Sequence, residues 1–440
     1  MGDENHDNDI CVMDGVTENE KVLQWLERRN REVHVRIDRV PFRDLKGWRF
    51  DAGTGDLVHQ SGRFFSVVGL NVYTNTGTVS RWTQPIINQP EVGILGILCK
   101  DFGGVPHYLM QAKIEPGNVN CVQLSPTVQA TRSNYMQVHG GKRPAYLDYF
   151  LNAASGQVVL DQLQSEQGAR FYRKRIRNMI VRTEDDVACG EDFRWLTLPQ
   201  IKDLMRHDNM VNMDARTVFS GLREAGPDRS LDGLLSVDEI LHRISHLKGK
   251  YELTADRIGL RDVADWTVAE DEIVRKDRRF FRVIGVDVTI ENREVAHWSQ
   301  PLVEPMQEGL CVLFAKRFDG VMHYLLQAKV ECGNFDVVEL APTIQCLTGP
   351  YLNPIGYVPR FLPDFLEDRI PGRKLVDVLQ SEEGGRFYHE QNRNVVIELD
   401  ESFEIDESEN FLWLTMPQIK EFLRFNNYLN IQVRSLVSML

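Results

Sequence analysis

The segment QAKIEPGNVNCVQLSPTVQATRSNY, residues 111–135, returns as QAKVECGNFDVVELAPTIQCLTGPY at residues 327–351. Around it, residues 64–178 align with residues 280–394 without a gap, and WLTLPQIK at 195–202 matches WLTMPQIK at 413–420 after a shift of two residues. Repeated phrases of this length predict a duplicated domain. A period above 200 residues is too long for a solenoid unit, so we expect each copy to carry its own core.

Strands are predicted where hydrophobic and polar residues alternate within each copy. In the first copy this pattern covers residues 63–74, 92–102 and 105–115. Gly103-Gly104 and Pro116-Gly117 are typical of hairpin connections between these strands. The EPGN sequence at 115–118 favours a type II turn.

Helix-start signals come between and after the strands. Thr197 and Thr415 each begin a capping box with proline inside the first turn, and Ser236 with Glu239 begins another. Thr17 with Glu20 has the same spacing, and Ser165 is placed to cap a helix over 166–175. The mixture of strands and helices predicts an α+β protein.

The chain is long enough for two domains, since 440 residues exceed one ordinary core. We therefore expect two tandem duplicated α+β domains with helical connectors. The predicted organisation is an N-terminal arm and helix at 1–46, a first repeat at 47–222, a helical linker at 223–262 and a second repeat at 263–440.

Composition narrows the function classes. Hydrophobic content of 42% and charged content of 26% are typical of a soluble globular protein, and the acidic start MGDENHDNDI does not resemble a signal peptide. No apolar run is long enough for a membrane span, so we expect a cytoplasmic protein without membrane contact. A net charge of -13 argues against nucleic-acid binding. The seven cysteines are scattered without a C-x-x-C pair, which favours reduced thiols.

The repeated strand has one polar face. Gln111, Lys113 and Glu115 lie on one side of it, because alternate residues of a strand share a face. The second copy keeps Gln327, Lys329 and Glu331 at the same positions. This agreement favours a ligand-lining role, with an exposed sheet face as the alternative.

The loop that follows differs between the copies. QATRSNY at 129–135 is polar throughout, whereas the second copy reads QCLTGPY at 345–351. Loops on a rigid sheet are common binding sites, so the first copy is the better candidate. Arg132 could bind a phosphate oxygen. Trp82, beside Gln84, could stack on a base or fill a core, and Trp298 repeats it.

These phrases, with QSEQGARFYRKRIRN at 164–178 and QSEEGGRFYHEQNRN at 380–394, resemble the NDP-hexose 2,3-dehydratases of deoxysugar biosynthesis. The resemblance runs from about Trp25 to the C-terminus. It implies two tandem Nudix-like domains, a homodimer, and dTDP-4-keto-6-deoxyglucose as substrate. A separate NADPH-dependent 3-ketoreductase would act on the product. The R-E-x-x-E-E core of the Nudix signature is missing, which argues against a magnesium-dependent phosphohydrolase.

The reaction implied by this resemblance is a β-elimination. The ketone at carbon 4 acidifies the proton on carbon 3, and the hydroxyl on carbon 2 then leaves as water. Because the ketone is the electron sink, we expect no cofactor and no metal. The hypothesis assigns Glu115 as base and Lys113 or Tyr135 as donor to the ketone oxygen.

The remaining candidates fall into two groups. Arg132 and Asn134 are expected to contact the diphosphate or the sugar, with Glu166 and Arg177 as reserves. The other substrate-binding candidates are Trp82, Gln84, Gln111, Asn118, Gln129, Thr131 and Ser133. A second pocket, expected to be vestigial because Cys332 replaces Pro116 and its loop is altered, comprises Trp298, Gln327, Lys329, Glu331, Gln345, Tyr351 and Arg393.

Two alternatives stay open on the residues alone. One is a Nudix-type hydrolase that splits the sugar nucleotide and needs magnesium. The other is a non-catalytic protein that binds a sugar nucleotide in two pockets and leaves it unchanged.

Overall fold

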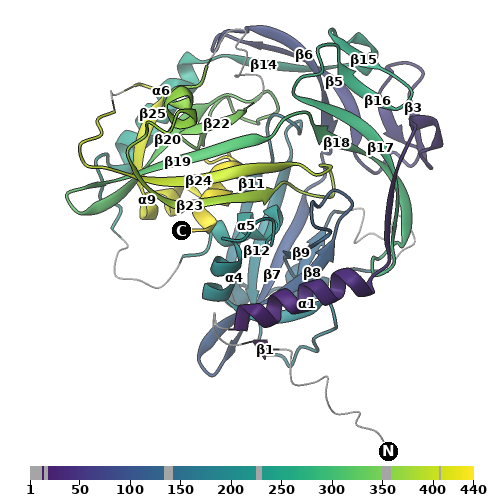
Figure 1. Cartoon of the computed structure of the whole chain (residues 1–440), viewed down its shortest axis with the longest axis horizontal. Coiled ribbons are helices and arrows are strands. Elements are labelled where there is room, and N and C mark those ends of the chain that lie inside the picture. The colour runs from purple at the N-terminus through teal and green to yellow at the C-terminus, as the bar shows by residue number, and fades with distance from the viewer. Residues whose placement is uncertain (1–11, 14–17, 133–141, 224–229, 349–357, 406–407) are drawn as a thin grey trace, which may run out of the picture.

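The computed structural model describes residues 12–13, 18–132, 142–223, 230–348, 358–405 and 408–440. It is a mixed α+β structure dominated by sheets, as expected from the sequence (Figure 1). Each copy contributes one large sheet and most of one small sheet. The predicted strands are confirmed, and the pairing of β7 with β8 confirms the Gly103-Gly104 hairpin.

The large sheets share one arrangement. In the first, the order β13-β8-β7-β12-β11 combines antiparallel pairs with a parallel pairing of β7 and β12, and the second has β25-β20-β19-β24-β23 in the same places. The strands of the first are β1 (Val12–Met13), β7 (Gly93–Phe102), β8 (Val105–Ile114), β9 (Val122–Ser125), β10 (Val128–Ala130), β11 (Val158–Ser165), β12 (Arg175–Arg182) and β13 (Phe193–Thr197). Those of the second are β19 (Gly309–Phe318), β20 (Val321–Lys329), β21 (Glu339–Ala341), β22 (Ile344–Leu347), β23 (Gly372–Ser381), β24 (Gln391–Leu399) and β25 (Phe411–Thr415).

The small sheets exchange a strand. The strand that precedes the first copy, β2 (Val35–Val40), pairs with β17 of the second copy, whereas β14 (Leu253–Ile258), which precedes the second copy, pairs with β5 of the first. The other members are β3 (Trp48–Phe50), β4 (Leu57–His59), β5 (Ser66–Thr74) and β6 (Arg81–Asn88) in one sheet, and β15 (Trp266–Val268), β16 (Glu272–Arg275), β17 (Phe281–Ile290) and β18 (His297–Pro305) in the other.

The helices confirm most of the predicted starts. Thr197, Ser236 and Thr415 cap their helices through the predicted boxes. The α-helices are α1 (Asn19–Glu32), α3 (Leu147–Leu151), α4 (Leu198–Leu204), α5 (Met213–Ser220), α6 (Val237–Lys250), α8 (Leu362–Leu366), α9 (Met416–Phe422) and α10 (Ile431–Ser438). Short 3₁₀ turns are η2 (Phe42–Asp44), η3 (Ser155–Gln157) and η4 (Leu260–Asp262).

Two helix starts differ from the prediction. The N-cap of α1 is Glu18, while Thr17 lies outside the described residues. Ser165 ends strand β11, and the predicted helix over 166–175 is absent from this described stretch. That segment instead bonds to the other copy, because Gly168 accepts the backbone N–H of Gly333 at 2.6 Å. A tertiary contact has replaced the local helix.

The turn at 115–118 is present, since the N–H of Asn118 donates to the carbonyl of Glu115 at 3.1 Å. It is not a type II turn, because Gly117 lacks the positive φ that type II requires. The glycine is needed for another reason: an added Cβ would lie 1.6 Å from the carbonyl oxygen of Phe387. Gly333 in the second copy approaches Phe171 in the same way. Each repeated turn therefore docks onto the repeated QSE segment of the other copy.

The largest hydrophobic cluster is shared by both copies. It joins Leu95 and Ile97 of the first large sheet to Leu313 and Val396 of the second. Each large sheet also has a cluster of its own on its other face. The expectation of one separate core per copy is therefore only partly correct, because exchanged elements bury the inner faces together.

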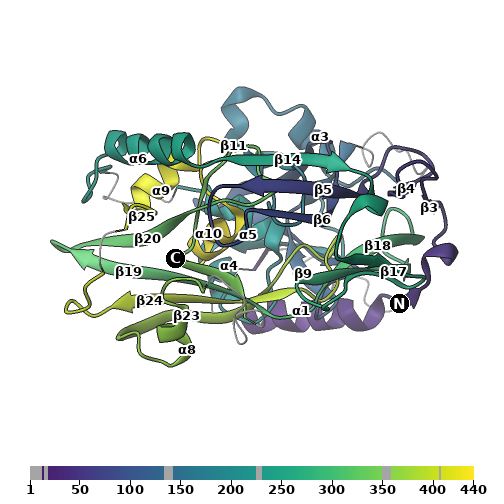
Figure 2. The same cartoon turned by 90° about the horizontal axis from the view of Figure 1, so that it is seen from above.

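Helices α5 and α10 pack against each other at the centre of the molecule (Figure 2). Arg216 of α5 and Arg434 of α10 are both fully buried. Arg216 donates to the side chain of Ser435 and to the carbonyl of Ser381, and Arg434 donates to Thr217 and to the carbonyl of Ser165. These bonds stabilise the interface, since a buried guanidinium needs partners for its donors.

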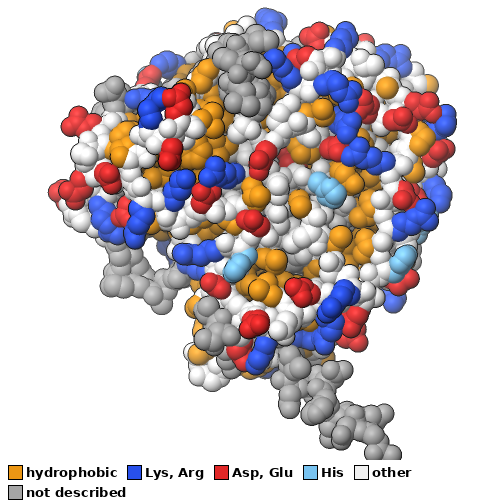
Figure 3. All heavy atoms as spheres, in the orientation of Figure 1, with side chains coloured by type: hydrophobic (Ala, Val, Ile, Leu, Met, Phe, Trp, Pro, Cys, Tyr) orange, Lys and Arg blue, Asp and Glu red, His pale blue; other side chains and the backbone are white. Residues whose placement is uncertain are grey.

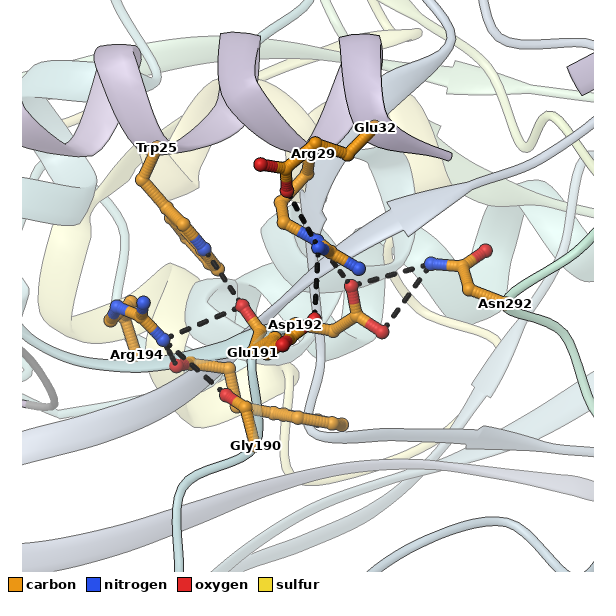
Figure 4. Close-up of polar contacts among 9 residues, drawn as sticks. Trp25, Arg29, Glu32, Gly190, Glu191, Asp192, Arg194 and Asn292 are labelled. Carbon is orange, nitrogen blue, oxygen red and sulfur yellow. Dashed lines mark hydrogen bonds and ion pairs between the residues drawn. The ribbon is translucent and has the colours of Figure 1, made fainter. Parts of the chain in front are cut away.

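Helix α1 docks on the loop before β13 (Figure 4). The indole N–H of Trp25 donates to the carbonyl of Glu191 at 2.9 Å, and Nε of Arg29 donates to Asp192 at 2.8 Å. Asp192 also accepts from Asn292 of the second copy at 3.3 Å. The N-terminal helix and the β17–β18 hairpin are thus tied to the same carboxylate.

Cysteines and membrane propensity complete the description. The free thiols in the described part are Cys99, Cys121, Cys311, Cys332 and Cys346. Cys189 is disulfide-bonded, so the expectation of reduced thiols is wrong at this position. Among the described residues, no helix has the length and apolarity needed to cross a membrane.

Candidate functional site

A cavity of about 620 Å³ lies between the two copies. Strands β8 and β10, the start of β12 and helix α5 supply its inner wall from the first copy. The β17–β18 hairpin and the QSE loop of the second copy close the other side. The site is therefore composite, and neither copy encloses it alone.

Lys113, Gln129 and Glu115 form a hydrogen-bonded row along its inner wall. The ammonium of Lys113 donates to Oε1 of Gln129 at 3.0 Å, and the amide of Gln129 donates to Oε1 of Glu115 at 3.0 Å. The Lys113 ammonium lies 3.8 Å from the same carboxylate oxygen. The second oxygen of Glu115 is buried without a hydrogen-bond partner in the described part of the chain, so it has acceptor capacity left for a ligand.

The second copy adds a cation to this row. Arg293, in the β17–β18 hairpin, lies 3.9 Å from Oε1 of Glu115 and donates to the carbonyl of Ile114 at 2.6 Å. Its guanidinium lies 5.8 Å from the ring centre of Trp298. Glu115 thus has two cations within 4 Å, one from each copy.

Four further carboxyl groups line the cavity, those of Glu166, Asp214, Glu294 and Glu383, and the pKa is raised in all but Glu294. Burial and the neighbouring Glu383 raise the pKa of Glu166 to about 8. Burial raises the pKa of Asp214 well above its usual range, and burial with nearby Glu115 also raises the pKa of Glu383. A carboxyl group with a raised pKa keeps its proton to higher pH, so Glu166 in particular can act as an acid at neutral pH.

Two buried lysines accompany these carboxyl groups. Burial and the charge of Arg293 lower the pKa of Lys113, and burial lowers the pKa of Lys174. Lys174 also donates to the carbonyl of Glu91 at 2.6 Å. A lysine with a lowered pKa gives up its proton more readily, so Lys113 can serve as a proton donor to an oxygen bound nearby.

Aromatic and basic side chains line the cavity as well. Arg386 lies 4.1 Å from the ring centre of Phe65 and donates to Gln89 at 3.3 Å. The remaining lining side chains here include Lys46, Trp48, His59, Phe64, Lys142 and His297. Flat rings with cations beside them suit a base and a diphosphate.

The structure brings together part of the predicted first site. Lys113, Glu115, Gln129, Thr131 and Glu166 line the cavity. Ser133, Asn134 and Tyr135 lie outside the described residues. Arg132 is exposed, Arg177 forms a surface ion pair with Asp161, and Asn118 donates to the carbonyl of Cys121. Gln111 lies on β8, two residues before Lys113, and does not line the cavity.

The tryptophans occupy opposite places from those expected. Trp298, assigned to the second pocket, lines the cavity of Lys113, whereas Trp82 packs near Cys332 of the second copy. Gln84 donates to the carbonyl of Ala169 and accepts from Trp82. The reason is the crossing of the copies, since each β-hairpin covers the large sheet of the other half.

The predicted second set is partly gathered. Lys329 donates to the carbonyl of Gln345 at 2.9 Å, and Gln345 donates to Glu331 at 3.1 Å. Gln327 donates to the carbonyl of Pro342, and Arg393 pairs with Asp377 on the surface. Tyr351 lies outside the described residues.

Sequence reasoning missed Lys174, Asp214, Arg293, Glu383 and Arg386. A signal for four of them was available in the repeat alignment, because the paired positions differ in charge. Lys174 aligns with Glu390, Asp214 with Gln432, Arg293 with Gly77 and Glu383 with Gln167. Arg386 aligns with Arg170, so the alignment carries no such signal for it.

In the described ranges, no three His, Cys, Asp or Glu side chains converge as ligands for a metal ion. The chemistry open to the residues present is acid–base work: carboxyl groups to take and give protons, and cations to stabilise an oxyanion. Together with the aromatic rings, the site has the features of a lyase or hydrolase acting on a nucleotide-linked substrate.

Comparison with known proteins identifies the family to which the chain belongs. The family model for NDP-hexose 2,3-dehydratase matches residues 19–222 and again residues 237–440. The chain belongs to the NDP-hexose 2,3-dehydratase family. The predicted family and its reaction class are thereby confirmed, and the double match agrees with the predicted duplication.

Full-length relatives agree. The chain is 46% identical to a dTDP-4-dehydro-6-deoxy-alpha-D-glucopyranose 2,3-dehydratase of Saccharopolyspora spinosa, over 99% of this chain and 93% of that protein. It is 44% identical to a protein of the same name from Amycolatopsis orientalis, over 97% and 91%. A third, from Streptomyces violaceoruber, is 43% identical over 94% and 95%.

Proposed function

We propose that this protein removes water across carbons 2 and 3 of dTDP-4-keto-6-deoxyglucose, giving a 3,4-diketo-2,6-dideoxy sugar nucleotide. The observation that carries the proposal is the composite cavity, whose lining combines buried carboxyl groups and lysines with aromatic rings and cations. The sugar would lie against the carboxyl groups and the nucleotide against the aromatic rings. The substrate named for the full-length relatives has these two parts.

Glu115 takes the proton from carbon 3 in this proposal. Its unpartnered oxygen can face the sugar, while Lys113 and Arg293 place positive charge beside it. The electrons of the C3–H bond move toward the ketone oxygen at carbon 4, giving an enolate. No cofactor is required, because the ketone accepts the charge.

Lys113 stabilises the enolate by donating to its oxygen. It is the lysine closest to Glu115, and its pKa is lowered by burial, so proton donation to an oxyanion is favoured. Tyr135 stays the alternative donor. Arg132 and Asn134 stay proposed contacts to the diphosphate or sugar, and Trp298 and Arg386 join them as candidate contacts to the substrate.

The finer structural and cellular expectations are part of the same proposal. Each repeat is proposed to be Nudix-like, with domain boundaries at 46/47, 222/223 and 262/263. A mixed sheet with a parallel central pair and one packed helix is consistent with this assignment. Homodimer formation, a cytoplasmic location, and a separate NADPH-dependent 3-ketoreductase that uses the product are proposed from the resemblance.

The decisive experiment is to incubate dTDP-4-keto-6-deoxyglucose with the protein in deuterated buffer. A 3-ketoreductase and NADPH are added to trap the labile product for mass spectrometry. We expect a trapped sugar that lacks the hydroxyl on carbon 2 and carries deuterium there. Unchanged sugar nucleotide would contradict the proposal and favour the binding-protein alternative.

The hydrolase alternative predicts a different product. Release of dTMP that depends on magnesium would establish it in the same assay. Nucleic acid is not a proposed ligand, since the net charge is -13 and acidic and basic side chains are interspersed over the face shown in Figure 3.

A further inference from the structure

Glu115 and Glu383 converge on one point although they belong to different copies. A Cβ added to Gly385 would lie 3.1 Å from Oε1 of Glu383 and 3.6 Å from Oε1 of Glu115. Glu115 directly follows strand β8, and Glu383 follows strand β23. Both side chains line the cavity, so the missing side chain of Gly385 leaves space between two carboxyl groups.

At the equivalent position of the first copy, this space is occupied by a side chain. Gly385 aligns with Ala169, and Glu383 aligns with Gln167. Gln167 donates to Glu382, so this amide is engaged in a structural bond. The second arrangement therefore has a methyl group where the cavity has space, and an amide where the cavity has a carboxyl group. The two arrangements therefore differ in the second carboxyl group and in the space beside it, both of which a mechanism with two carboxyl groups needs.

The surroundings give the two carboxyl groups different tasks. Glu115 has the positive charges of Lys113 and Arg293 within 4 Å of its carboxyl group, one from each copy. Burial, followed by the charge of Glu115, raises the pKa of Glu383, although Arg386 and Lys174 oppose this. Two carboxyl groups in different surroundings within one site can divide the work of acid–base catalysis.

We infer that Glu383, contributed by the second copy, is the catalytic acid that protonates the departing carbon 2 hydroxyl, and that Gly385 keeps open the space the reacting carbons occupy. This inference rests on the proposed function.

The step balances as follows. Glu115 takes the proton from carbon 3, and the electron pair of that bond forms the enolate. The enolate pair then forms the C2=C3 double bond while the C2–O bond breaks, and the Glu383 proton makes the leaving group water. The resulting enol keeps its hydroxyl on carbon 3. When it tautomerises, carbon 2 gains a proton and the carbon 3 hydroxyl loses one, which returns both carboxyl groups to their starting states.

The test separates deprotonation from elimination. In deuterated buffer, Glu383→Gln is expected to exchange the carbon 3 proton of recovered substrate at a rate within about tenfold of the unmodified protein. Its rate of trapped product is expected to fall by about 10²- to 10⁴-fold, the usual effect of losing a general acid. Glu115→Gln should lose both exchange and product. Circular dichroism and thermal unfolding establish that the variants are folded.

The outcomes distinguish the inference from the function beneath it. If the unmodified protein makes no trapped product, the proposed function fails. If it does, and folded Glu383→Gln keeps full turnover, only the inference fails. Loss of exchange together with turnover in Glu383→Gln would also overturn it, since Glu383 would then act in deprotonation or binding.

Gly385→Ala tests the space between the carboxyl groups. We expect kcat to fall by about tenfold or more, because the added methyl group meets the Glu383 carboxylate. The Kd for dTDP is measured as well, so that a loss of nucleotide binding through the neighbouring Arg386 is told apart from a loss of catalysis. Ala169→Gly is the matched control at the related position and should leave kcat unchanged. Equal kcat in Gly385→Ala and the unmodified protein would contradict the assigned role of Gly385.

Discussion

Asp214 illustrates how protonation decides the effect of a substitution. Burial and three neighbouring carboxyl groups raise its pKa well above its usual range, which favours the neutral, protonated form. We predict that Asp214→Asn, which keeps a neutral polar side chain, changes kcat by less than about tenfold. Steady-state kinetics at pH 7 with the trapping reductase measures this. A loss as large as that of Glu115→Gln would mean that Asp214 acts as a carboxylate.

Arg293 is a residue whose role depends on charge. It lies 3.9 Å from Glu115 and donates to the backbone at Ile114. We predict that Arg293→Met, which keeps most of the length without the charge, lowers kcat by about 10-fold or more, because one of two cations beside the base is lost. The thermal midpoint and the Kd for dTDP serve as controls. Unchanged kcat would remove Arg293 from the site.

Among single residues, sequence reasoning located what a strand pattern encodes. Lys113 and Glu115 share a face by alternation, so their proximity was predictable. Their bonds to Gln129 were not, because Gln129 lies on β10, which pairs with β7 and not with β8. Arg293 and Glu383 were not, because their approach depends on how two distant hairpins and loops pack. Charge differences between aligned positions were the sole sequence signal for these two residues. Such differences indicate which residues matter but not where they lie in the structure.

At the scale of elements, α1 is held by one ion-pair cluster. Arg29 is 7% exposed and bonds to Asp192, Glu191 and Glu32. We predict that Arg29→Ala lowers the free energy of unfolding by about 1–3 kcal/mol, because Asp192 loses a charged partner. Urea unfolding measures the change. Arg31→Ala, at an exposed position of the same helix, is the control and should stay within about 0.5 kcal/mol.

Strand β21 carries a buried acid that links stability to pH. Glu339 accepts from Ser165 at 2.8 Å, and burial raises its pKa from 4.5 to about 7. Between these two values the unfolded chain releases the proton before the folded chain does. The stability contributed by the protonated form is thus complete below pH 4.5 and lost as the pH rises through 7.

Glu339→Gln should remove this dependence. The first copy supplies the precedent, since Gln123 at the aligned position accepts from Ser381 at 2.9 Å. We predict equal stability of variant and unmodified protein near pH 4.5, and a variant more stable by up to about 3 kcal/mol above pH 7. Urea unfolding at several pH values tests this. A constant difference across pH would show that Glu339 does not titrate in the folded protein.

Elements were predictable where their signals are local. Capping boxes at Thr197, Ser236 and Thr415 gave correct helix starts, since the cap itself satisfies the first backbone donors. The helix expected after Ser165 was wrong, because backbone bonds from Gly168 and Arg173 to Gly333 of the other copy, and from Tyr172 to Ile87, replace helical ones. A contact between residues 168 and 333 has no local signature.

At the scale of the whole molecule, the two copies are interdependent. Each gives a strand to the small sheet of the other, and the largest core contains residues of both. We predict that residues 18–222 produced alone give no trapped product, because Arg293, Trp298 and Glu383 are then missing from the cavity. Co-production with residues 230–440 should restore turnover if the halves associate. Product from the first fragment alone would contradict a composite site.

Because the copies exchange strands and cavity residues, sequence differences between them affect the half of the molecule in which they do not occur. A substitution in the hairpin or QSE loop of one copy alters the chemistry of the cavity built on the other copy's sheet. Selection on a single reaction therefore acts on both halves of the gene, at different positions in each. The second copy remains essential even though its own polar loop has changed. Deleting the whole copy would remove Glu383, Arg293 and Trp298 from the cavity on the first copy's sheet. Both copies are retained because each one supplies residues to the pocket or sheet of the other.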